Sequence, residues 1–355
     1  MKKLLLFSLL ILPLTLFAKI WIVDSNSGST SKDFTNLQEA HDGASAGDTL
    51  YLIGSGVSYV SNGLNVTKRL IIIGPGFFLT NPETQVSLQP AFLTLSNCNQ
   101  TIVFSEGSAG SAIMGLTIRG TVYVNTNNIL IKRNHFMESS ISTCSTAARL
   151  TISGSQTHVA QNYFQAPNFG ATITIVVTEG LTNVVIKNNY LSHACGIPSG
   201  CFEAFTWALL SQANTGIEVT NNVIQGGILV SNAIVRNNIF PTSISSQSFV
   251  TNNSVVSNNM TNLTFLPAGN GNINSVPINS IFMDSGTTDG RWKLKDGSPA
   301  IGSGYNGTDM GMFGGAEPYV LSGIPPIPTI YSLEAPLTGE KNTGLPIEIK
   351  AKSNN

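Results

Sequence analysis

The chain has 355 residues and a formal net charge of −1, and only 10% of its residues are charged, where about 25% is usual for soluble domains. This near-neutral balance argues against nucleic acid as a partner. Hydrophobic residues make up 42% of the chain. A disordered low-complexity chain is therefore disfavoured, and a folded solenoid with Ser, Thr, Asn and Gly at its outward positions is favoured.

Residues 1–18 have the pattern of a secretory signal peptide. Lys2 and Lys3 precede the apolar run from Leu4 to Phe17, and the small Ala18 follows. The run is too short to span a bilayer comfortably. We therefore expect a mature chain that begins near Lys19, has no transmembrane segment and is secreted or lies at the cell surface or in the periplasm.

The first part of the mature chain predicts three strands and one helix. The strands are expected at residues 19–24, 47–53 and 70–76. Between the first two, residues 34–44 form an amphipathic pattern in which Leu37, Ala40 and Ala44 share one face.

Six later segments share one phrase: an apolar residue, two variable positions, an asparagine, one more position and usually a large apolar residue. The phrases cover residues 131–136, 159–164, 186–191, 219–224, 235–240 and 256–261. Their asparagines are Asn134, Asn162, Asn189, Asn222, Asn238 and Asn259, at intervals of 28, 27, 33, 16 and 21 residues. Each repeat is too short to bury its own apolar face, which indicates stacking.

An apolar strand followed by a turn asparagine is typical of one coil of a parallel β-helix. Asn tolerates a left-handed backbone, and its amide can bond to the Asn one coil above, which predicts an asparagine ladder. The alternative is that these residues mark ordinary hairpin turns, but hairpins favour Asn-Gly followed by a returning strand.

The order of these segments resembles the right-handed parallel β-helix proteins, the pectate-lyase-like group. The resemblance rests on the helix at 34–44, the phrase Gly-Asp-Thr-Leu-Tyr at 47–51 and Ile-Ile-Gly-Pro-Gly at 72–76, and it continues through 111–118 and the Asn phrases. It implies an all-β solenoid over residues 19–316, with an N-terminal capping helix. The segments 297–302 and 307–313 resemble the closing coil of such proteins.

Alignment of the six phrases predicts columns of stacked side chains about 4.8 Å apart. One column is an internal row: Phe136, Phe164, Leu191, Ile224, Phe240 and Thr261. Because successive side chains of a strand point to opposite faces, the preceding column, with His135, Tyr163 and Tyr190, should face outward. Sugars stack on such exposed rings, so this stripe is a candidate binding surface. The alternative is that loops cover the rings and they simply pack.

A third column holds cations on alternate coils, at Lys132, Lys187 and Arg236. A spacing of roughly 10 Å, about two strand separations, is close to the repeat of a disaccharide. The column suggests an acidic polysaccharide as partner, whereas cations facing water are usually only solubilising.

Catalysis is poorly supported. Enzymes of this fold resemble one another in using clustered acids, yet residues 49–283 contain no Asp. Their only acids are Glu83, Glu106, Glu138, Glu179, Glu203 and Glu218, which share no offset in the aligned phrases. No cofactor is expected, since calcium would need a ligand cluster that the sequence does not show.

A metal-independent lyase needs only a base and a cation beside the uronate. Its candidate residues are Arg119, Lys132, Arg133, His135, Arg149, His158, Lys187 and His193. Lys132, His135 and Lys187, with Tyr190, fall on neighbouring columns and are the catalytic candidates if the chain is an enzyme.

Two cysteines, Cys195 and Cys201, could close a small loop by a disulfide in an exported chain. Cys98 and Cys144 could equally be small buried residues. Beside His193 and Glu203 the Cys-x5-Cys spacing is only a weak metal signal.

Residues 317–355 differ in composition, with six prolines that exclude a central strand. We expect an extended tail that packs along or across the last coils or projects from the solenoid, with one edge strand near 345–350. The whole sequence thus predicts an exported parallel β-helix that binds polysaccharide or acts in adhesion without catalysis. The alternative is a polysaccharide lyase or hydrolase. The glycan and the oligomeric state are not determined.

Overall fold

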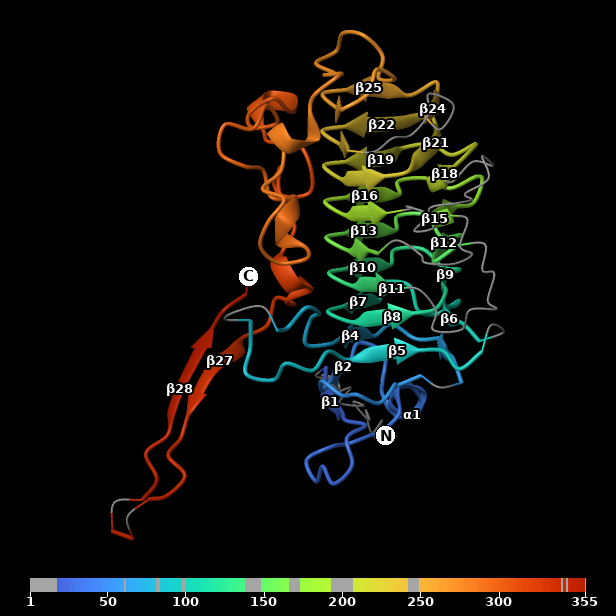
Figure 1. Cartoon of the computed structure of the whole chain (residues 1–355). Coiled ribbons are helices and arrows are strands. Elements are labelled where there is room, and N and C mark those ends of the chain that lie inside the picture. Colours follow the sequence, from blue (N-terminus) through green and yellow to red (C-terminus); the bar gives the residue numbers. More distant parts are fainter. Residues whose placement is uncertain are drawn as a thin grey trace, which may run out of the picture.

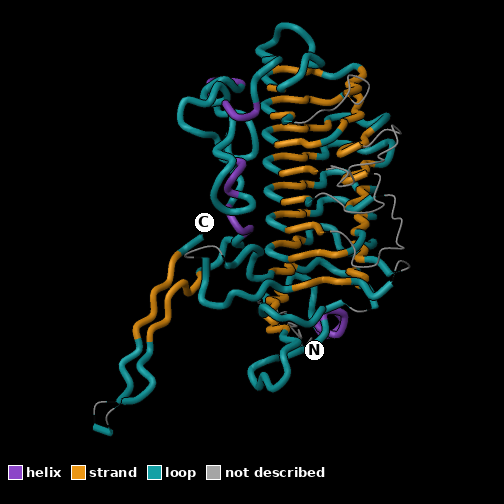
Figure 2. Tube along the Cα trace, viewed as in Figure 1, coloured by secondary structure: helices purple, strands orange, loops and turns teal. Residues whose placement is uncertain are grey.

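The computed structural model describes residues 18–354, except 61, 81–83, 98–99, 138–147, 166–172, 193–206, 242–248, 340 and 343. Its strands wind into a right-handed parallel β-helix with three parallel sheets (Figures 1 and 2). The predicted fold class is therefore confirmed.

The sheets are named A, B and C. Sheet A has ten strands: β1 (Ile20–Val23), β2 (Thr49–Leu52), β4 (Ile71–Ile73), β7 (Ala112–Met114), β10 (Leu130–Lys132), β13 (His158–Ala160), β16 (Val185–Lys187), β19 (Ile217–Thr220), β22 (Ala233–Arg236) and β25 (Val255–Ser257).

Sheet B has eight strands: β3 (Leu64–Val66), β6 (Ile102–Phe104), β9 (Val122–Val124), β12 (Leu150–Ile152), β15 (Ile173–Val177), β18 (Trp207–Ser211), β21 (Gly227–Ser231) and β24 (Phe249–Asn252). Sheet C also has eight: β5 (Phe92–Thr94), β8 (Thr117–Arg119), β11 (His135–Met137), β14 (Tyr163–Phe164), β17 (Tyr190–Ser192), β20 (Val223–Gln225), β23 (Ile239–Phe240) and β26 (Met260–Thr261).

A row of buried asparagines marks the turn between sheets A and C. The Nδ2 of Asn162 donates to the Oδ1 of Asn189 at 3.0 Å, and the backbone N–H of Asn162 donates to the same oxygen at 2.9 Å. The same side-chain bond joins Asn134 to Asn162. It also joins each later asparagine to the next along the row, in the order Asn189, Asn222, Asn238, Asn259 and Asn272. The row ends at Asn272, one coil beyond the six phrases. Each amide thus satisfies backbone groups of a turn that water does not reach.

The left-handed position of this turn is one residue earlier than the sequence predicts. The residues directly before the asparagines of the six phrases have φ between +50° and +57°; they are Arg133, Gln161, Asn188, Asn221, Asn237 and Asn258. The ladder asparagine itself is left free to point inward and bond to its neighbours. The residue before it takes the strained backbone conformation and points its side chain outward, toward the segment described below.

The interior holds the predicted apolar column. Phe136 and Phe164 stack at 4.2 Å between ring centroids with planes 7° apart, and both are fully buried. At the N-terminal end, helix α1 (Leu37–Gly43) places Leu37 and Ala40 in the same core cluster. The helix begins after Asn36, whose side chain caps it. Among the described residues no helix is both long and apolar enough to cross a membrane.

Residues 276–324, here named the return segment, run back along the outside of the solenoid from its last coil toward the first (Figure 1). The segment contains four short 3-10 helices: η2 (Ile278–Ser280), η3 (Gly290–Trp292), η4 (Tyr305–Gly307) and η5 (Leu321–Gly323). The predicted closing coil near 297–315 is wrong, because this stretch covers the side of the solenoid. Met310 and Met312 lie in the same buried cluster as Val223 and Ile239 of the outward column of sheet C. Burial of these apolar side chains stabilises the segment in this position.

Turn side chains hold the return segment in the reverse order of the coils. Asn237 accepts from Tyr305 N–H at 2.8 Å, Asn221 donates to Asp309 C=O at 3.1 Å, Asn188 to Met312 C=O at 3.0 Å, Gln161 to Pro318 C=O at 2.7 Å and Arg133 to Ile324 C=O at 2.8 Å. Polar side chains at the left-handed turn position therefore dock a segment that forms no strand of sheets A, B or C.

The tail forms a hairpin of two antiparallel strands, β27 (Thr329–Glu334) and β28 (Glu348–Lys352). The predicted edge strand is β28, whereas β27 was not expected. The hairpin leaves the solenoid near its N-terminal coils and projects away from it (Figure 1). Of the two arrangements expected for the tail, packing on the last coils and projection from the solenoid, the structure has the second. The return segment causes this, since it has already carried the chain back along the solenoid.

Candidate functional site

The predicted aromatic stripe has the expected register and outward direction. His135 pairs with Tyr163 and Tyr163 with Tyr190 in sheet C, and the two tyrosine rings stack at 4.5 Å. The stripe is nevertheless buried: His135 is 3%, Tyr163 5% and Tyr190 6% exposed. The prediction of an exposed binding surface at these three residues is therefore wrong.

The stripe is covered by two segments that the repeat pattern does not include. Phe78 packs on His135 at 4.7 Å and on Tyr163 at 5.4 Å between ring centroids. Trp292 of the return segment covers Tyr190 at 4.8 Å. Burial raises the pKa of Tyr163 to about 12 and also raises the pKa of Tyr190. Neither phenol therefore ionises easily enough to serve as a base.

His135 is held as a neutral imidazole. Its Nε2 lies 3.0 Å from Gln165 Oε1, which accepts the ring N–H. Burial lowers the pKa of His135 to about 3, and the positive charges of Arg149 and Arg119 act in the same direction. A ring that solvent does not reach can neither bind nor act on a polysaccharide, so His135 is also excluded as a catalytic candidate.

This burial predicts a pH dependence of stability. The unfolded pKa of His is about 6.5, so between pH 3 and 6.5 the unfolded chain binds more protons than the folded chain. The stability gained by keeping His135 neutral in the fold is fully present above pH 6.5 and is lost as the pH falls toward 3. We expect His135 alone to lower the free energy of unfolding by about 2 kcal/mol between pH 7 and pH 5. Urea unfolding of the wild type and of His135→Phe measures it: the pH dependence of the variant should be smaller by that amount, and equal dependence would contradict this burial.

The cation column also has the predicted register. Lys132 pairs with Ala160, Ala160 with Lys187, and Thr220 with Arg236, so the short interval before Arg236 does not break the column. Each cation is nevertheless engaged by the return segment. Arg236 lies over the ring of Tyr305 at 3.9 Å, and both lysines approach Glu317.

The structure brings together four titratable side chains: Lys132, His158, Lys187 and Glu317. The first three are among the lyase candidates predicted from the sequence, whereas Glu317 is not. The Glu317 carboxylate lies 3.2 Å from Lys187 Nζ and 3.9 Å from Lys132 Nζ. Burial alone would raise the pKa of Glu317, but the hydrogen bond and charge of Lys187 bring it below the usual value. Burial lowers the pKa of Lys132.

His158 lies beside these charges. Burial, followed by the charge of Lys187, lowers the pKa of His158 to about 4. Its Nε2 is buried and has no hydrogen-bond partner within the described part of the chain. The ring is therefore a neutral base near the ammonium groups of Lys132 and Lys187. The return segment covers part of this face, since Glu317 lies against both lysines.

The remaining acids do not assemble. Glu106, Glu179 and Glu218 are exposed on separate coils, while Glu83, Glu138 and Glu203 lie outside the described residues. Within those residues no three His, Cys, Asp or Glu side chains gather as metal ligands. The four cysteines, with the proposed Cys195–Cys201 disulfide and His193, also lie outside them.

An open groove of about 440 Å³ lies between helix α1 and the first strands of sheet B. Its lining is rich in amide and hydroxyl groups and consists of Asn36, Gln38, Glu39, Asn62, Gly63, Leu64, Asn65, Gln100, Thr101 and Val103. Glu39, Asn62 and Asn65 are exposed, and the only acid in this lining is Glu39. Sequence reasoning missed this site because its residues come from a helix and two strands that precede the Asn phrases.

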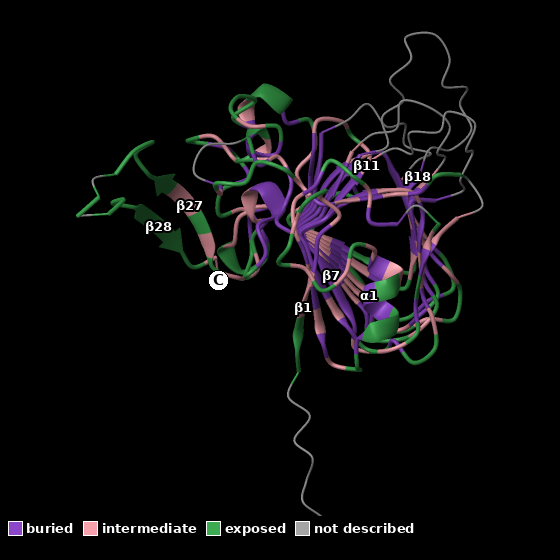
Figure 3. Ribbon diagram, turned by 90° about the horizontal axis from the view of Figure 1, so that it is seen from below, coloured by how far each residue is buried: buried purple, intermediate pink, exposed green. Residues whose placement is uncertain are grey.

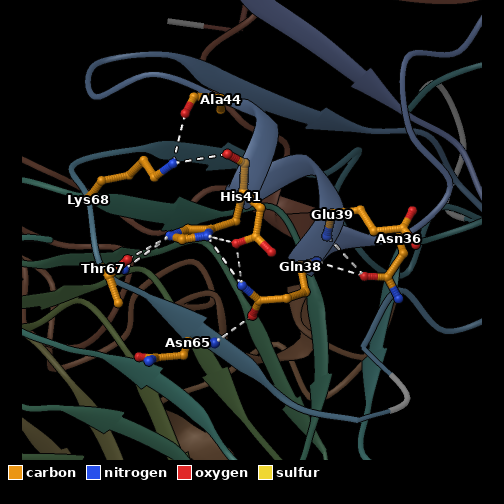
Figure 4. A network of polar contacts seen from close by, with 9 residues as sticks. Asn36, Gln38, Glu39, His41, Ala44, Asn65, Thr67 and Lys68 are labelled. Atoms are coloured by element: carbon orange, nitrogen blue, oxygen red, sulfur yellow. Dashed lines mark hydrogen bonds and ion pairs between the residues drawn. The ribbon is translucent and has the colours of Figure 1, made fainter.

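Polar contacts fix the helix side of the groove (Figure 4). Gln38 Oε1 accepts from Asn65 N–H at 2.9 Å, and His41 Nε2 accepts from Thr67 N–H at 3.1 Å. The other ring nitrogen of His41 lies 2.8 Å from Asp42, whose pKa that bond lowers. Lys68 donates to Ala44 C=O at 2.9 Å. These bonds join α1 to β3 and give the groove a preformed wall.

On the far wall, Gln100 accepts from Ser96 N–H at 2.8 Å and its amide nitrogen reaches Asn62 Oδ1 at 3.4 Å. The Asn62 amide nitrogen, the Thr101 hydroxyl and the Glu39 carboxylate have no hydrogen bond to any described residue. The groove can therefore both donate to and accept from the hydroxyl groups of a ligand.

The fold places the chain in the class of right-handed parallel β-helix proteins. No protein-family model matches it, and no curated protein matches its sequence. Among solved structures, it is similar to XylC in complex with xylose, with 11% identity, a TM-score of 0.35 and coverage of 65% of this chain and 53% of that chain. It thus spans about half the length of XylC.

A second similar structure is alginate lyase from Paenibacillus sp. str. FPU-7. The identity is 13% and the TM-score 0.29, with coverage of 68% of this chain and 76% of that chain. Similarity at these levels concerns the path of the chain and carries no conclusion about activity.

Proposed function

We propose that this chain is an exported parallel β-helix protein that binds polysaccharide without cleaving it, in the groove beside α1. The observation that carries the proposal is the gathering of amide, hydroxyl and carboxylate side chains around an open groove with a preformed wall. Such groups bond to sugar hydroxyls without needing charge on the ligand. The proposed ligand is therefore a neutral polysaccharide, and the acidic partner suggested by the cation column loses its support.

Two further features support binding over catalysis. The candidate catalytic residue His135 is sealed, and Tyr190 is buried with its hydroxyl 2.7 Å from Gln225 Oε1. In the groove, Glu39 has no second carboxylate among the lining residues, so the two-carboxylate mechanism of glycoside hydrolysis is not available there. Export is proposed from the signal-peptide pattern of residues 1–18.

The test is affinity electrophoresis of the purified chain, without residues 1–18, on neutral and acidic polysaccharides, with product assays in parallel. We expect retardation by at least one neutral polysaccharide and no new reducing ends. Replacement of Asn62 and Glu39 together by alanine should weaken binding roughly tenfold, since about two hydrogen bonds are lost. The matched control removes the same side-chain types elsewhere on the surface, at Asn279 and Glu179, and should bind normally. Equal retardation of both double variants would contradict the groove.

A polysaccharide lyase is the second candidate, because Lys132, His158 and Lys187 converge. A neutral imidazole could take a proton while the ammonium groups neutralise a uronate carboxylate. In this reading Glu317 occupies the position of that carboxylate. Unsaturated product from an acidic polysaccharide, abolished by Lys187→Ala and increased by Glu317→Gln, would establish this candidate in place of the first.

A further inference from the structure

The projecting hairpin has one apolar and one polar face. In its antiparallel register Ile330 lies opposite Ala351 and Leu333 opposite Ile349, whereas Ser332 lies opposite Lys350 and Glu334 opposite Glu348. Residues opposite one another share a face. The apolar side chains are well exposed, with Ile330 at 47%, Leu333 at 53% and Ile349 at 56%. Figure 3 shows the exposed ribbon standing away from the body.

A ribbon of two strands is marginally stable by itself, and an open strand edge pairs readily with another strand. The two edges of this ribbon differ. On the β27 side, Ile330 C=O already accepts from Val86 N–H at 2.8 Å. On the β28 side, the described residues contribute no neighbouring strand, and all five residues of β28 are exposed. The outer edge of β28 is therefore the accessible one.

We propose that the β28 strands of two copies of this chain pair antiparallel and join the two hairpins into a four-stranded sheet. A two-fold axis at Ile349 places Glu348 of each copy opposite Lys350 of the other. On the opposite face Ile349 meets Ile349, and Ile347 meets Ala351. Both faces are then matched across the new strand pair.

The sequence of β28, Glu-Ile-Lys-Ala-Lys, selects this register and this partner. A shift of the axis to Lys350 puts two lysines opposite each other, and a shift in the other direction to Glu348 does the same with two glutamates. An axis between residues places charged side chains opposite apolar ones. Like charges directly opposite are unfavourable, so the axis at Ile349 is the favoured one. A strand that complements itself under a two-fold axis specifies a second copy, because such an interface uses the same patch on both subunits.

The position of the hairpin permits the pairing. It extends away from the solenoid, so the outer edge of β28 faces solvent along its length (Figures 1 and 3). Its hydrogen bonds with the rest of the chain lie at its base, where Arg133 donates to Asn354 C=O at 3.5 Å and Val86 N–H donates to Ile330 C=O at 2.8 Å. Charge changes in the middle of β28 should therefore leave the solenoid intact.

The test is sedimentation analysis of the purified chain over a range of concentrations, with charge-exchange variants. The wild type should show a monomer–dimer equilibrium. Lys350→Glu or Glu348→Lys alone places like charges opposite at both symmetric positions and should raise the dissociation constant at least about tenfold. The double exchange Glu348→Lys with Lys350→Glu restores opposite charges and should restore dimerisation. Lys341→Glu, at the hairpin tip, is the control for a change of net charge and should behave as the wild type.

Thermal unfolding of every variant verifies that the solenoid is unchanged. A wild type that stays monomeric at all concentrations overturns the proposal. So does a dimer that the single exchanges leave unaffected, since its interface must then lie elsewhere. A dimer that the single exchanges weaken and the double exchange does not restore also contradicts the register.

Discussion

Replacement of Asn189 by alanine should lower the free energy of unfolding by about 4 kcal/mol. Asn189 is fully buried in the middle of the asparagine row. It accepts from the backbone and the amide of Asn162 and donates to Val159 C=O and to Asn222. Alanine leaves a buried N–H and a buried C=O without partners, and each such group costs about 1–3 kcal/mol.

Urea unfolding followed by circular dichroism measures this change. Asn279→Ala, at an exposed position of the return segment, is the matched control and should stay within about 0.5 kcal/mol of the wild type. If the two variants are equally stable, the row of asparagines does not stabilise the turn between sheets A and C.

Gly323→Ala should release the end of the return segment. Gly323 has φ +53°, and an added Cβ would lie 2.1 Å from a Phe77 ring atom and 2.7 Å from Arg133 C=O. The backbone cannot yield there, because Phe77 N–H donates to Ser322 C=O at 2.8 Å. We expect the free energy of unfolding to fall by about 3 kcal/mol. The return segment should also be cleaved rapidly by protease, and the variant should bind more of a hydrophobic dye.

Gly302→Ala separates the steric effect from the backbone effect. Gly302 has a similar φ of +65°, but the nearest heavy atom to its added Cβ is 3.9 Å away. In this variant only the strain of Ala in the left-handed conformation should lower the free energy of unfolding, by about 1 kcal/mol, and the return segment should stay protected from protease. Equal protease sensitivity of the two variants would show that the segment is not anchored at Gly323.

The solenoid could be predicted from the sequence because its coils repeat one phrase. Equal offsets from the Asn place Lys132 beside Ala160 and Phe136 beside Phe164, and the structure has both pairs in register. The period of two along each strand then separates the inner column from the outer one. For this reason the direction of His135 and Tyr163 was correct even though their exposure was not.

The covering of the outer columns could not be predicted in this way. Residues 276–324 have no repeat, and their path is set by single contacts with distant residues, such as Asn188 with Met312 and Gln161 with Pro318. One signal was present in the phrases: the position before the ladder asparagine is always a polar residue of at least Asn size. An outward polar side chain that can hydrogen-bond to backbone, repeated on every coil, can hold another segment of the chain.

The outward columns of a solenoid are thus docking surfaces for its own chain as readily as for a ligand. Here the rings lie under Phe78 and Trp292, and the lysines face Glu317. The polysaccharide surface that we propose, the groove beside α1, lies where the return segment does not reach.

Hydrogen–deuterium exchange of the chain, with and without a polysaccharide that retards it, tests this account most directly. Binding in the groove should slow exchange at residues 62–65 and 100–103 and leave the Lys132–Lys187 face unchanged. Slower exchange around residues 158–160 and 185–187, or faster exchange across the return segment on binding, would contradict it, because the ligand would then occupy the face that the return segment covers.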